Sequence, residues 1–453
     1  MKTFSLFAFA FSFALCAAGA DARRIDFEHH YASTNYINHC ATRTEIPWYD
    51  PETQVLYCSE FVNAEMGTPM FSTNTLYTDL TDLGEKRIAE MDRAGIDVAV
   101  LSSTWPVDAF DPEDAIRVAK LSNDDVYEAT KRYPDRFMGT ALLPTLQVEA
   151  ATDELERCVK ELGFKYWHAQ SHMTGPDGKV RYIWEPEFEP ILAKAAELNV
   201  SIYLHPDYPT DADYWDSGLA YAGPGLGFGQ EVMQTVTHLI MNGTFDRYPN
   251  LRVILGHMGE YLPYVLDRMN YHLNLGRPGG GLSDGDGNIT CAETLYHYVV
   301  TNANIIVSTS GSADTNAFLC AKEALGADRI VFGSDWPYEN YTNSTAFIDT
   351  CELTDAEKAG VWSENAAKYI FHDAAFVRLG AVAQRYPWNG VLDIEYKTMY
   401  VNEVTFKANG TVIGKAPGTG GKAATANFNL NEVADGAFKN KQLKDVKITA
   451  TVE

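Results

Sequence analysis

Eight short apolar segments, each followed by a stretch with helical periodicity, constrain the fold of this chain more than any other feature. In ELERCVKELG, EPILAKAAELN and DTNAFLCAKEALGAD, apolar residues recur three or four positions apart, with charged residues between them. The predicted strands cover residues 24–30, 96–103, 136–143, 163–169, 199–205, 251–257, 304–310 and 329–335. Eight strand–helix units in about 350 residues predict an α/β fold of the (β/α)₈ TIM-barrel type with long insertions.

A doubly wound open sheet is the main rival fold. Such a sheet that binds nucleotides carries a glycine-rich turn after its first strand. Here the first strand runs into HHYAST, which contains no glycine. The barrel is therefore the preferred prediction.

The two ends of the chain differ from this central pattern. Residues 1–22 place a lysine before an apolar run and then small residues, the layout of a secretory signal peptide, so we expect an exported protein. After about residue 375, RYPWNGVLDIEY, EVTFKANGTVIG and KDVKITATVE alternate apolar and polar residues around Gly-rich turns. The predicted domains are thus 1–22 (signal peptide), 23–375 (catalytic barrel) and 376–453 (small antiparallel β module).

Composition excludes several functional classes. The 453 residues carry a formal net charge of −25, which argues against a nucleic-acid partner, and no segment after the signal is long and apolar enough to span a membrane. The six cysteines that follow the signal show no C-x-x-C spacing, which excludes a zinc ribbon. In an exported protein some of them could form disulfides, with Cys40 and Cys58 the nearest pair in sequence.

Polar side chains stand at the ends of four predicted strands, where barrel enzymes carry their catalytic groups. The first strand ends in IDFEHH, and its alternation puts Glu28 and His30 on one face and His29 on the other. The other three strand ends carry His205, His257 and Asp335.

These residue types suit a divalent metal. Imidazole nitrogens and carboxylate oxygens bind Zn²⁺ or Mn²⁺, and a catalytic site needs only three or four protein ligands. The predicted metal ligands are Glu28, His30, His205 and Asp335. His257 would then be free to shuttle protons, oriented by Glu260 three residues later.

Each of these residues also has a purely structural interpretation, because a single histidine at a strand end is more often a hydrogen-bonded packing residue. It is their joint placement that favours a site. His168 and His172 lie near the end of the fourth strand, where one of them could reach the pocket. Trp105 and Trp336 are each followed by proline and either pack in the core or wall an aromatic pocket.

Five motifs give the chain a family resemblance. LRVILGHMGEYLPYVLDRM, GSDWPYEN, IYLHPDYP, ERCVKELGF and LSNDDVYEATKRYPDRF resemble segments of the amidohydrolase-related decarboxylases, the family of γ-resorcylate and 2,3-dihydroxybenzoate decarboxylases. The resemblance covers about residues 24–372. It implies a distorted (β/α)₈ barrel that binds one divalent metal ion, Zn²⁺ or Mn²⁺, and removes CO₂ from a small hydroxylated aromatic carboxylic acid without oxidation. It also implies a homo-oligomer, either a dimer or a tetramer.

Carried over to this sequence, the family's motifs assign roles to individual residues. The E-x-H motif matches Glu28 and His30, the metal histidine His205, and the metal-bound aspartate Asp335. The catalytic residues match Asp335, His257 and Glu260, and the substrate-binding residues match Arg268 and Tyr338, beside the two tryptophans Trp105 and Trp336. The fourth strand departs from the family's mostly aliphatic pattern with FKYWHAQSH, which would reshape the pocket.

The implied mechanism is protonation of the ring carbon that bears the carboxylate, followed by loss of CO₂. Asp335 would donate this proton, which requires either a raised pKa or proton transfer from the substrate. Two alternatives remain open at this stage. One is a hydrolase that acts on a lactone or amide through a metal-bound water. The other is an exported binding or scaffold protein without catalysis.

Overall fold

The computed structural model describes residues 23–57, 74–216, 218, 220–272 and 290–371, together with six strands between residues 376 and 452. The predicted signal peptide, residues 1–22, lies outside these described residues. The chain divides into two compact units, one formed by Ala22–Ile370 and the other containing Phe371–Glu453. Each unit is described by itself.

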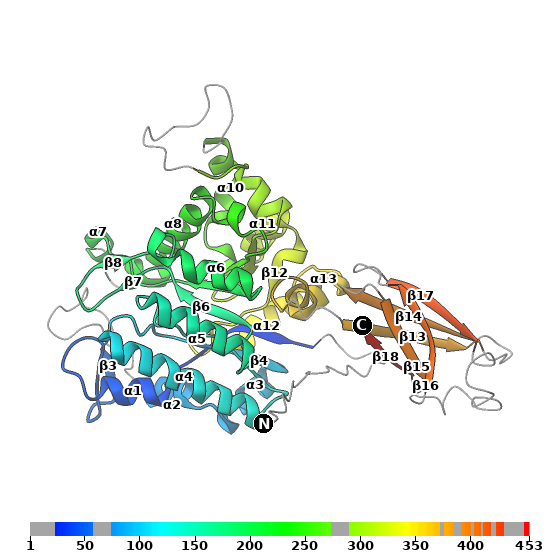
Figure 1. The fold of residues 1–453 in the computed structure, drawn as a ribbon, viewed down its shortest axis with the longest axis horizontal. Coiled ribbons are helices and arrows are strands. Elements are labelled where there is room, and N and C mark those ends of the chain that lie inside the picture. Colours follow the sequence, from blue (N-terminus) through cyan, green and yellow to red (C-terminus); the bar gives the residue numbers. More distant parts are fainter. Residues whose placement is uncertain are drawn as a thin grey trace, which may run out of the picture. The chain divides into compact units, whose positions relative to one another are not determined.

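The larger unit contains eight strands in parallel sheets, shown in Figure 1. One sheet has the order β1-β4-β5 and the other the order β12-β11-β10-β9-β6. The strands are β1 (Ile25–Tyr31), β4 (Val98–Ser103), β5 (Phe137–Gly139), β6 (Tyr166–Gln170), β9 (Ser201–His205), β10 (Val253–Leu255), β11 (Ile305–Ser308) and β12 (Ile330–Val331). Each overlaps one of the eight segments predicted from the sequence.

Isolated parallel bridges connect the edges of the two sheets. His29 of β1 pairs with Trp336, just beyond β12, and Ala141, just beyond β5, pairs with Trp167 of β6. β1 is thus paired with the segment after β12, and the segment after β5 is paired with β6. The unit is an α/β fold with mostly parallel sheets, consistent with a TIM barrel.

Helices follow the strands and bury one face each. In α5 the buried residues include Ala151, Leu155 and Cys158, the three-to-four spacing visible in the sequence. The longer helices are α3 (Glu85–Ala94), α4 (Pro112–Arg132), α5 (Val148–Lys160), α6 (Glu189–Glu197), α8 (Gly227–Met241), α10 (Leu262–His272), α11 (Thr315–Leu325) and α12 (Tyr341–Thr350). The shorter helices are α1 (Thr34–Cys40), α2 (Asn74–Thr81), α7 (Ala212–Trp215), α9 (Thr244–Arg247), α13 (Asp355–Ala359) and α14 (Asn365–Tyr369).

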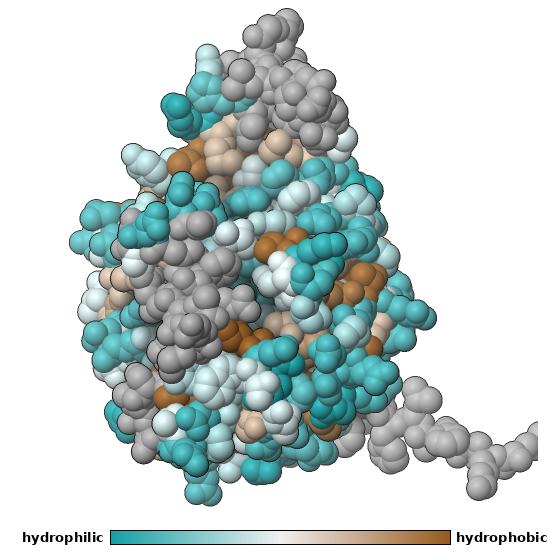
Figure 2. All heavy atoms as spheres, turned by 90° about the vertical axis from the view of Figure 1, so that its left-hand side faces the viewer, coloured by the Kyte–Doolittle hydropathy of each residue, from teal (hydrophilic) through white to brown (hydrophobic). Residues whose placement is uncertain are grey.

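Two short hairpins interrupt the alternation, as the long predicted insertions require. They are β2 (Trp48–Asp50) with β3 (Val55–Tyr57), and β7 (Met173–Thr174) with β8 (Val180–Arg181). The face in Figure 2 is mostly hydrophilic, with small separate hydrophobic patches. This surface agrees with the acidic composition.

The C-terminal strands pair antiparallel in two sheets, with the orders β13-β14-β17 and β16-β15-β18. Between the two sheets the rings of Phe406 and Phe428 lie 4.9 Å apart. The strands are β13 (Phe376–Gln384), β14 (Val391–Met399), β15 (Glu403–Ala408), β16 (Thr411–Pro417), β17 (Ala423–Asn429) and β18 (Ile448–Val452). The predicted domain boundaries remain predictions.

Two further sequence-based expectations bear on the environment of the protein. Among the described residues, no helix is both long enough and apolar enough to cross a membrane. Cys40 is a buried free thiol, and its suggested partner Cys58 lies outside the described residues.

Candidate metal centre and active site

The side chains predicted as metal ligands converge at the carboxyl ends of the strands. His30 Nε2 lies 3.5 Å from Glu28 Oε1 and 3.0 Å from Asp335 Oδ1. His205 Nε2 lies 3.6 Å from the same Glu28 oxygen. His205, at the end of β9, and Asp335, in the segment that follows β12, therefore lie close to Glu28 and His30 of β1, as the sequence predicts.

Glu28 is held so that one oxygen faces this cluster. The Tyr203 hydroxyl of β9 donates a hydrogen bond to Glu28 Oε2 and also lies 3.1 Å from Ser310 Oγ. Glu28 Oε1 is buried and has no hydrogen-bond partner in the part of the chain that the structure describes. The tyrosine therefore fixes the carboxylate while leaving one oxygen available.

His205 is oriented in a comparable way. Its Nδ1 lies 3.1 Å from Gln170 Oε1, the last residue of the neighbouring strand β6. An amide oxygen can only accept, so Nδ1 carries the proton and Nε2 presents a lone pair toward Glu28. A hydrogen bond of this kind is the usual support of a metal-binding histidine.

The residues present fit a divalent cation. Buried polar atoms normally find hydrogen-bond partners, yet both ring nitrogens of His30 and Glu28 Oε1 have none among the described residues. His30 Nε2 approaches Asp335 to 3.0 Å without hydrogen-bond geometry. Two imidazoles and two carboxylates converge here, and the unpartnered atoms of Glu28 and His30 lie among them, which matches a Zn²⁺ or Mn²⁺ donor set.

His257 lies beside this cluster with its own carboxylate partner. It follows β10 in a short 3₁₀ turn, His257–Gly259. Its Nδ1 lies 2.6 Å from Glu260 Oε1, and its Nε2 lies 3.7 Å from Asp335 Oδ2. His257 therefore connects Glu260 to the Asp335 carboxylate, as the sequence predicts.

The backbone around these groups adopts conformations that are rare for residues with a side chain. His257, Glu260 and Asp335 have φ values of 48°, 54° and 62°. Such positive values cost free energy and cluster at functional sites. Gly311 adjoins them with a φ of 59°, and a Cβ there would lie 2.6 Å from His257 Cδ2. Glycine thus makes room for the imidazole.

Electrostatics place the proton on His257 and not on Asp335. Burial alone would raise the pKa of the Asp335 carboxyl, but the adjacent His257 and His30 hold that pKa below its ordinary value. Burial alone would lower the pKa of His257, but Glu260 and Asp335 raise it well above its ordinary value. The sequence-based idea of a raised Asp335 pKa is therefore wrong, and its proton has to be delivered.

The predicted substrate-binding residues are not all brought to the cluster. The Tyr338 ring lies 5.4 Å from that of His30. Trp336 instead stacks on His29 at 4.7 Å, on the opposite face of β1 from His30. Trp105 stacks with Tyr36, 5.9 Å away, in a second buried cluster around α1 and α4. Arg268 is exposed on α10.

Of the two histidines that the sequence placed near the end of the fourth strand, His168 joins the cluster. Ring nitrogens of His30, His168 and His205 lie within 4.8 Å of one another. Burial, then the neighbouring His205 and His30, lower the pKa of His168 well below its ordinary value, so its ring is neutral. The alternation of β6 was the available signal, because it puts His168 on the same face as Gln170. His172, by contrast, pairs with Glu231 at 3.1 Å.

Comparisons with known proteins agree with this geometry. The chain matches the amidohydrolase family over residues 25–370. It is 32% identical over 301 residues to the γ-resorcylate decarboxylase of Rhizobium sp. (strain MTP-10005), a match that covers 65% of this chain and 89% of that one. It is 31% identical to the decarboxylase orsB of Emericella nidulans, over 58% of this chain and 77% of that one.

Solved structures show the same similarity. A 2,6-dihydroxybenzoate decarboxylase in complex with 2,6-dihydroxybenzoate superposes with a TM-score of 0.63 at 28% identity and covers 76% of this chain and 98% of its own. The 5-carboxyvanillate decarboxylase of Novosphingobium aromaticivorans, complexed with manganese and 4-hydroxy-3-methoxy-5-nitrobenzoic acid, gives 0.66 at 29% identity, over 77% and 96%. With the family match spanning residues 25–370, the chain belongs to the amidohydrolase family.

Proposed function

We propose that this protein is a metal-dependent carboxy-lyase that removes CO₂ from a hydroxylated aromatic carboxylic acid without oxidation. The observation that carries the proposal is the convergence of Glu28, His30, His205 and Asp335, with unpartnered atoms on Glu28 and His30, next to the His257–Glu260 pair. The similar decarboxylases support it, because they act on aromatic acids of this class and three of the similar solved structures hold manganese.

Glu28, His30, His205 and Asp335 would hold one divalent cation, Mn²⁺ or Zn²⁺. When bound, such a cation supplies a Lewis acid for the carboxylate and the adjacent phenol oxygen of the substrate. The side chains of Glu28 and His30 are fully buried, whereas those of Asp335 and His257 are 15% and 22% exposed. The substrate therefore approaches from the side of Asp335 and His257, where Tyr338 also lies.

The protein's own residues move the proton. His257 donates its Nδ1 proton in a hydrogen bond to Glu260 and passes a second proton from Nε2 to Asp335 Oδ2, which lies 3.7 Å away. Asp335 then protonates the ring carbon that bears the carboxylate. The bond from that carbon to the carboxylate breaks, its electron pair returns to the ring, and CO₂ leaves. His257 takes up a new proton from solvent, which balances the reaction.

The experiment is a product assay on purified, metal-loaded protein. Incubation with 2,6-dihydroxybenzoate, 2,3-dihydroxybenzoate and salicylate should release CO₂ and the corresponding phenol from at least one of them. A parallel panel of lactones should remain intact. Ring opening of a lactone, with no decarboxylation of any ortho-hydroxy acid, would replace the lyase with the hydrolase.

We also infer four properties of the whole chain. The eight parallel strands close into one distorted (β/α)₈ barrel within residues 23–375, supported by the bridges at both sheet edges. Residues 376–453 form a separate antiparallel β module, residues 1–22 direct export, and the protein assembles as a homo-dimer or homo-tetramer. N-terminal sequencing of the secreted protein and sedimentation analysis test the last two of these properties.

A further inference from the structure

His168 is a buried histidine with no hydrogen-bond partner among the residues that the structure describes. It is the middle residue of β6 and is only 3% exposed. Neither of its ring nitrogens has a partner among the described residues. The nearby His29 and His172 are also buried, but each has a carboxylate at its Nδ1, Asp26 at 2.9 Å and Glu231 at 3.1 Å.

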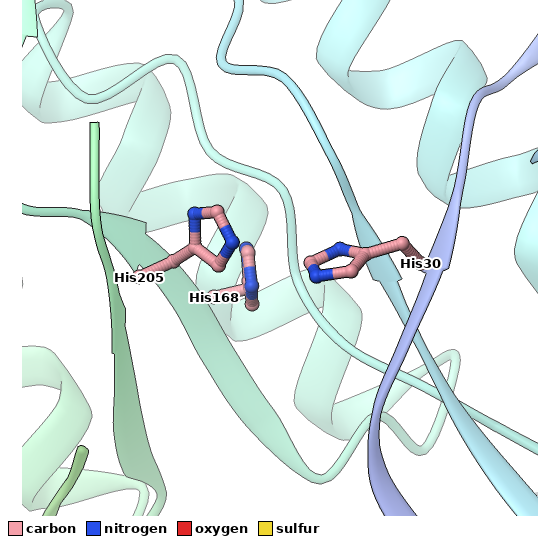
Figure 3. Close-up of side chains that lie close together, drawn as sticks. All are labelled: His30, His168 and His205. Carbon is pink, nitrogen blue, oxygen red and sulfur yellow. The ribbon is translucent and has the colours of Figure 1, made fainter. Parts of the chain in front are cut away.

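The position of the His168 ring explains this isolation. Figure 3 shows the ring together with those of His205 and His30, and the three centroids form a triangle with His168 5.0 Å from His205, His168 6.0 Å from His30, and His30 5.0 Å from His205. One face of the ring stacks on Tyr203 at 5.6 Å, and Tyr203 is the residue that holds Glu28. His168 is thus packed against the predicted metal ligands His30 and His205 and against Tyr203, and its nitrogens meet no hydrogen-bonding group among the described residues.

A buried imidazole with two unpartnered nitrogens is costly to a folded protein, and a cation at the cluster removes that cost for one of them. The nitrogen atoms of His30, His168 and His205 already lie within 4.8 Å of one another. Donor atoms of one tetrahedral zinc ion are about 3.4 Å apart, so the three nitrogens have to approach one another by about 1.4 Å at most to bind the same ion.

We propose that His168 is a third imidazole ligand of the divalent cation, in addition to Glu28, His30, His205 and Asp335, and that it shifts the metal preference of the site toward Zn²⁺. This inference rests on the proposed metal site. Nitrogen-rich donor sets favour Zn²⁺ over Mn²⁺, whereas carboxylate-rich sets suit Mn²⁺. A third imidazole changes the donor set from two nitrogens and two oxygens to three nitrogens and two oxygens.

A crystal structure of the zinc-loaded wild-type protein tests the ligation directly. The proposal expects one ion per chain, with a ring nitrogen of His168 at about 2.1 Å from it. An ion held by Glu28, His30, His205 and Asp335, with His168 farther than about 3 Å, would overturn the inference and leave the proposed function intact. A protein that binds neither ion would instead refute the metal site itself.

Competition between the two ions tests the preference in solution. Wild-type protein and the variant His168→Leu are equilibrated with mixtures of Zn²⁺ and Mn²⁺, and the bound metals are measured by elemental analysis. The ratio of zinc to manganese affinity should fall at least about tenfold in the variant. An unchanged ratio in a folded variant contradicts the proposal.

His172→Gln is the matched control, because it alters a buried histidine that lies two residues beyond β6 and faces Glu231. It should leave the affinity ratio within about twofold of wild type. If His168→Leu does not fold, the crystal structure of the wild-type protein still decides the question.

Discussion

His257 and Glu260 are joined by a contact of 2.6 Å between Nδ1 and Oε1, although both residues have positive φ values. The chain thus accepts two unfavourable backbone conformations in order to bring this imidazole and this carboxylate together. A contact kept at such a cost, directly beside Asp335, is what an active site requires for proton delivery.

Removing the carboxylate charge should slow the reaction. Glu260→Gln keeps the size of the side chain but takes away the charge that raises the pKa of His257. We expect kcat to fall about 100-fold, the lower end of the range for proton transfer. Because the pKa of His257 falls in this variant, His257 loses its proton at a lower pH. The basic limit of the pH–rate profile, measured with 2,6-dihydroxybenzoate, should therefore move to lower pH.

Glu231→Gln is the control for that variant, because Glu231 also pairs with a buried histidine, His172, at 3.1 Å. It should change kcat by less than about threefold. Equal effects of the two substitutions would show that the His257–Glu260 pair serves the fold and not the chemistry.

The hydroxyl of Tyr203 should matter for metal binding. Tyr203→Phe frees the Glu28 carboxylate to rotate, so we expect metal affinity to fall about 10- to 100-fold. Tyr166→Phe removes a hydroxyl that donates to the carbonyl oxygen of Phe27 and does not bond to Glu28. The latter variant should lose about 1 kcal/mol of stability and keep its metal affinity. Titration of metal-free protein with a competing chelator distinguishes the two.

Asp26 should contribute strongly to stability at the edge between β1 and β12. It accepts hydrogen bonds from Ser334 N at 2.9 Å and Ser334 Oγ at 2.6 Å, and it pairs with His29. Asp26→Asn should reduce the free energy of unfolding by about 3 kcal/mol, because it leaves buried donors facing an amide. Asp349→Asn breaks the half-exposed pair with Arg24 and should cost less than about 1 kcal/mol. Urea unfolding measures both.

Asp108 should make stability fall as pH rises. Burial raises the pKa of this carboxyl to about 7, although Leu146 N donates to it at 2.9 Å. Between about pH 4 and pH 7 the folded state then keeps a proton that the unfolded state has lost. Stability therefore decreases by about 1.4 kcal/mol per pH unit across this window and is constant above it.

Asp108→Asn tests this relationship, because asparagine keeps the acceptor oxygen and cannot ionise. The variant should lack that component of the pH dependence and be more stable than wild type at pH 8. If urea unfolding gives both proteins the same slope between pH 5 and pH 7, the carboxyl is already ionised in the folded state.

Much of the fold was accessible from the sequence because strands and helices differ in period. The eight apolar segments predicted the eight parallel strands, and the strand ends predicted that Glu28, His30, His205, His257 and Asp335 would meet. This succeeded because neighbouring parallel strands bring their carboxyl ends to the same edge of a sheet.

The remaining features depend on packing that periodicity does not encode. Trp336 was open to two interpretations, and its stacking on His29 beneath the Arg87 guanidinium follows from the partners it meets in space. The sequence could not decide whether His168 or His172 reaches the pocket, because that depends on which of them meets the rings of His30 and His205 in space. The protonation of His257 likewise depends on contacts in space, because Glu260 and Asp335 together raise the pKa of its imidazole.

Elemental analysis of the purified, natively loaded protein tests the central claim most directly. We expect about one Mn²⁺ or Zn²⁺ per chain, which the double variant Glu28→Gln, His205→Gln no longer retains while keeping the wild-type circular dichroism spectrum. A wild-type protein that stays metal-free after exposure to excess Mn²⁺ and Zn²⁺, or a double variant that binds the ion as tightly as wild type, would contradict the account.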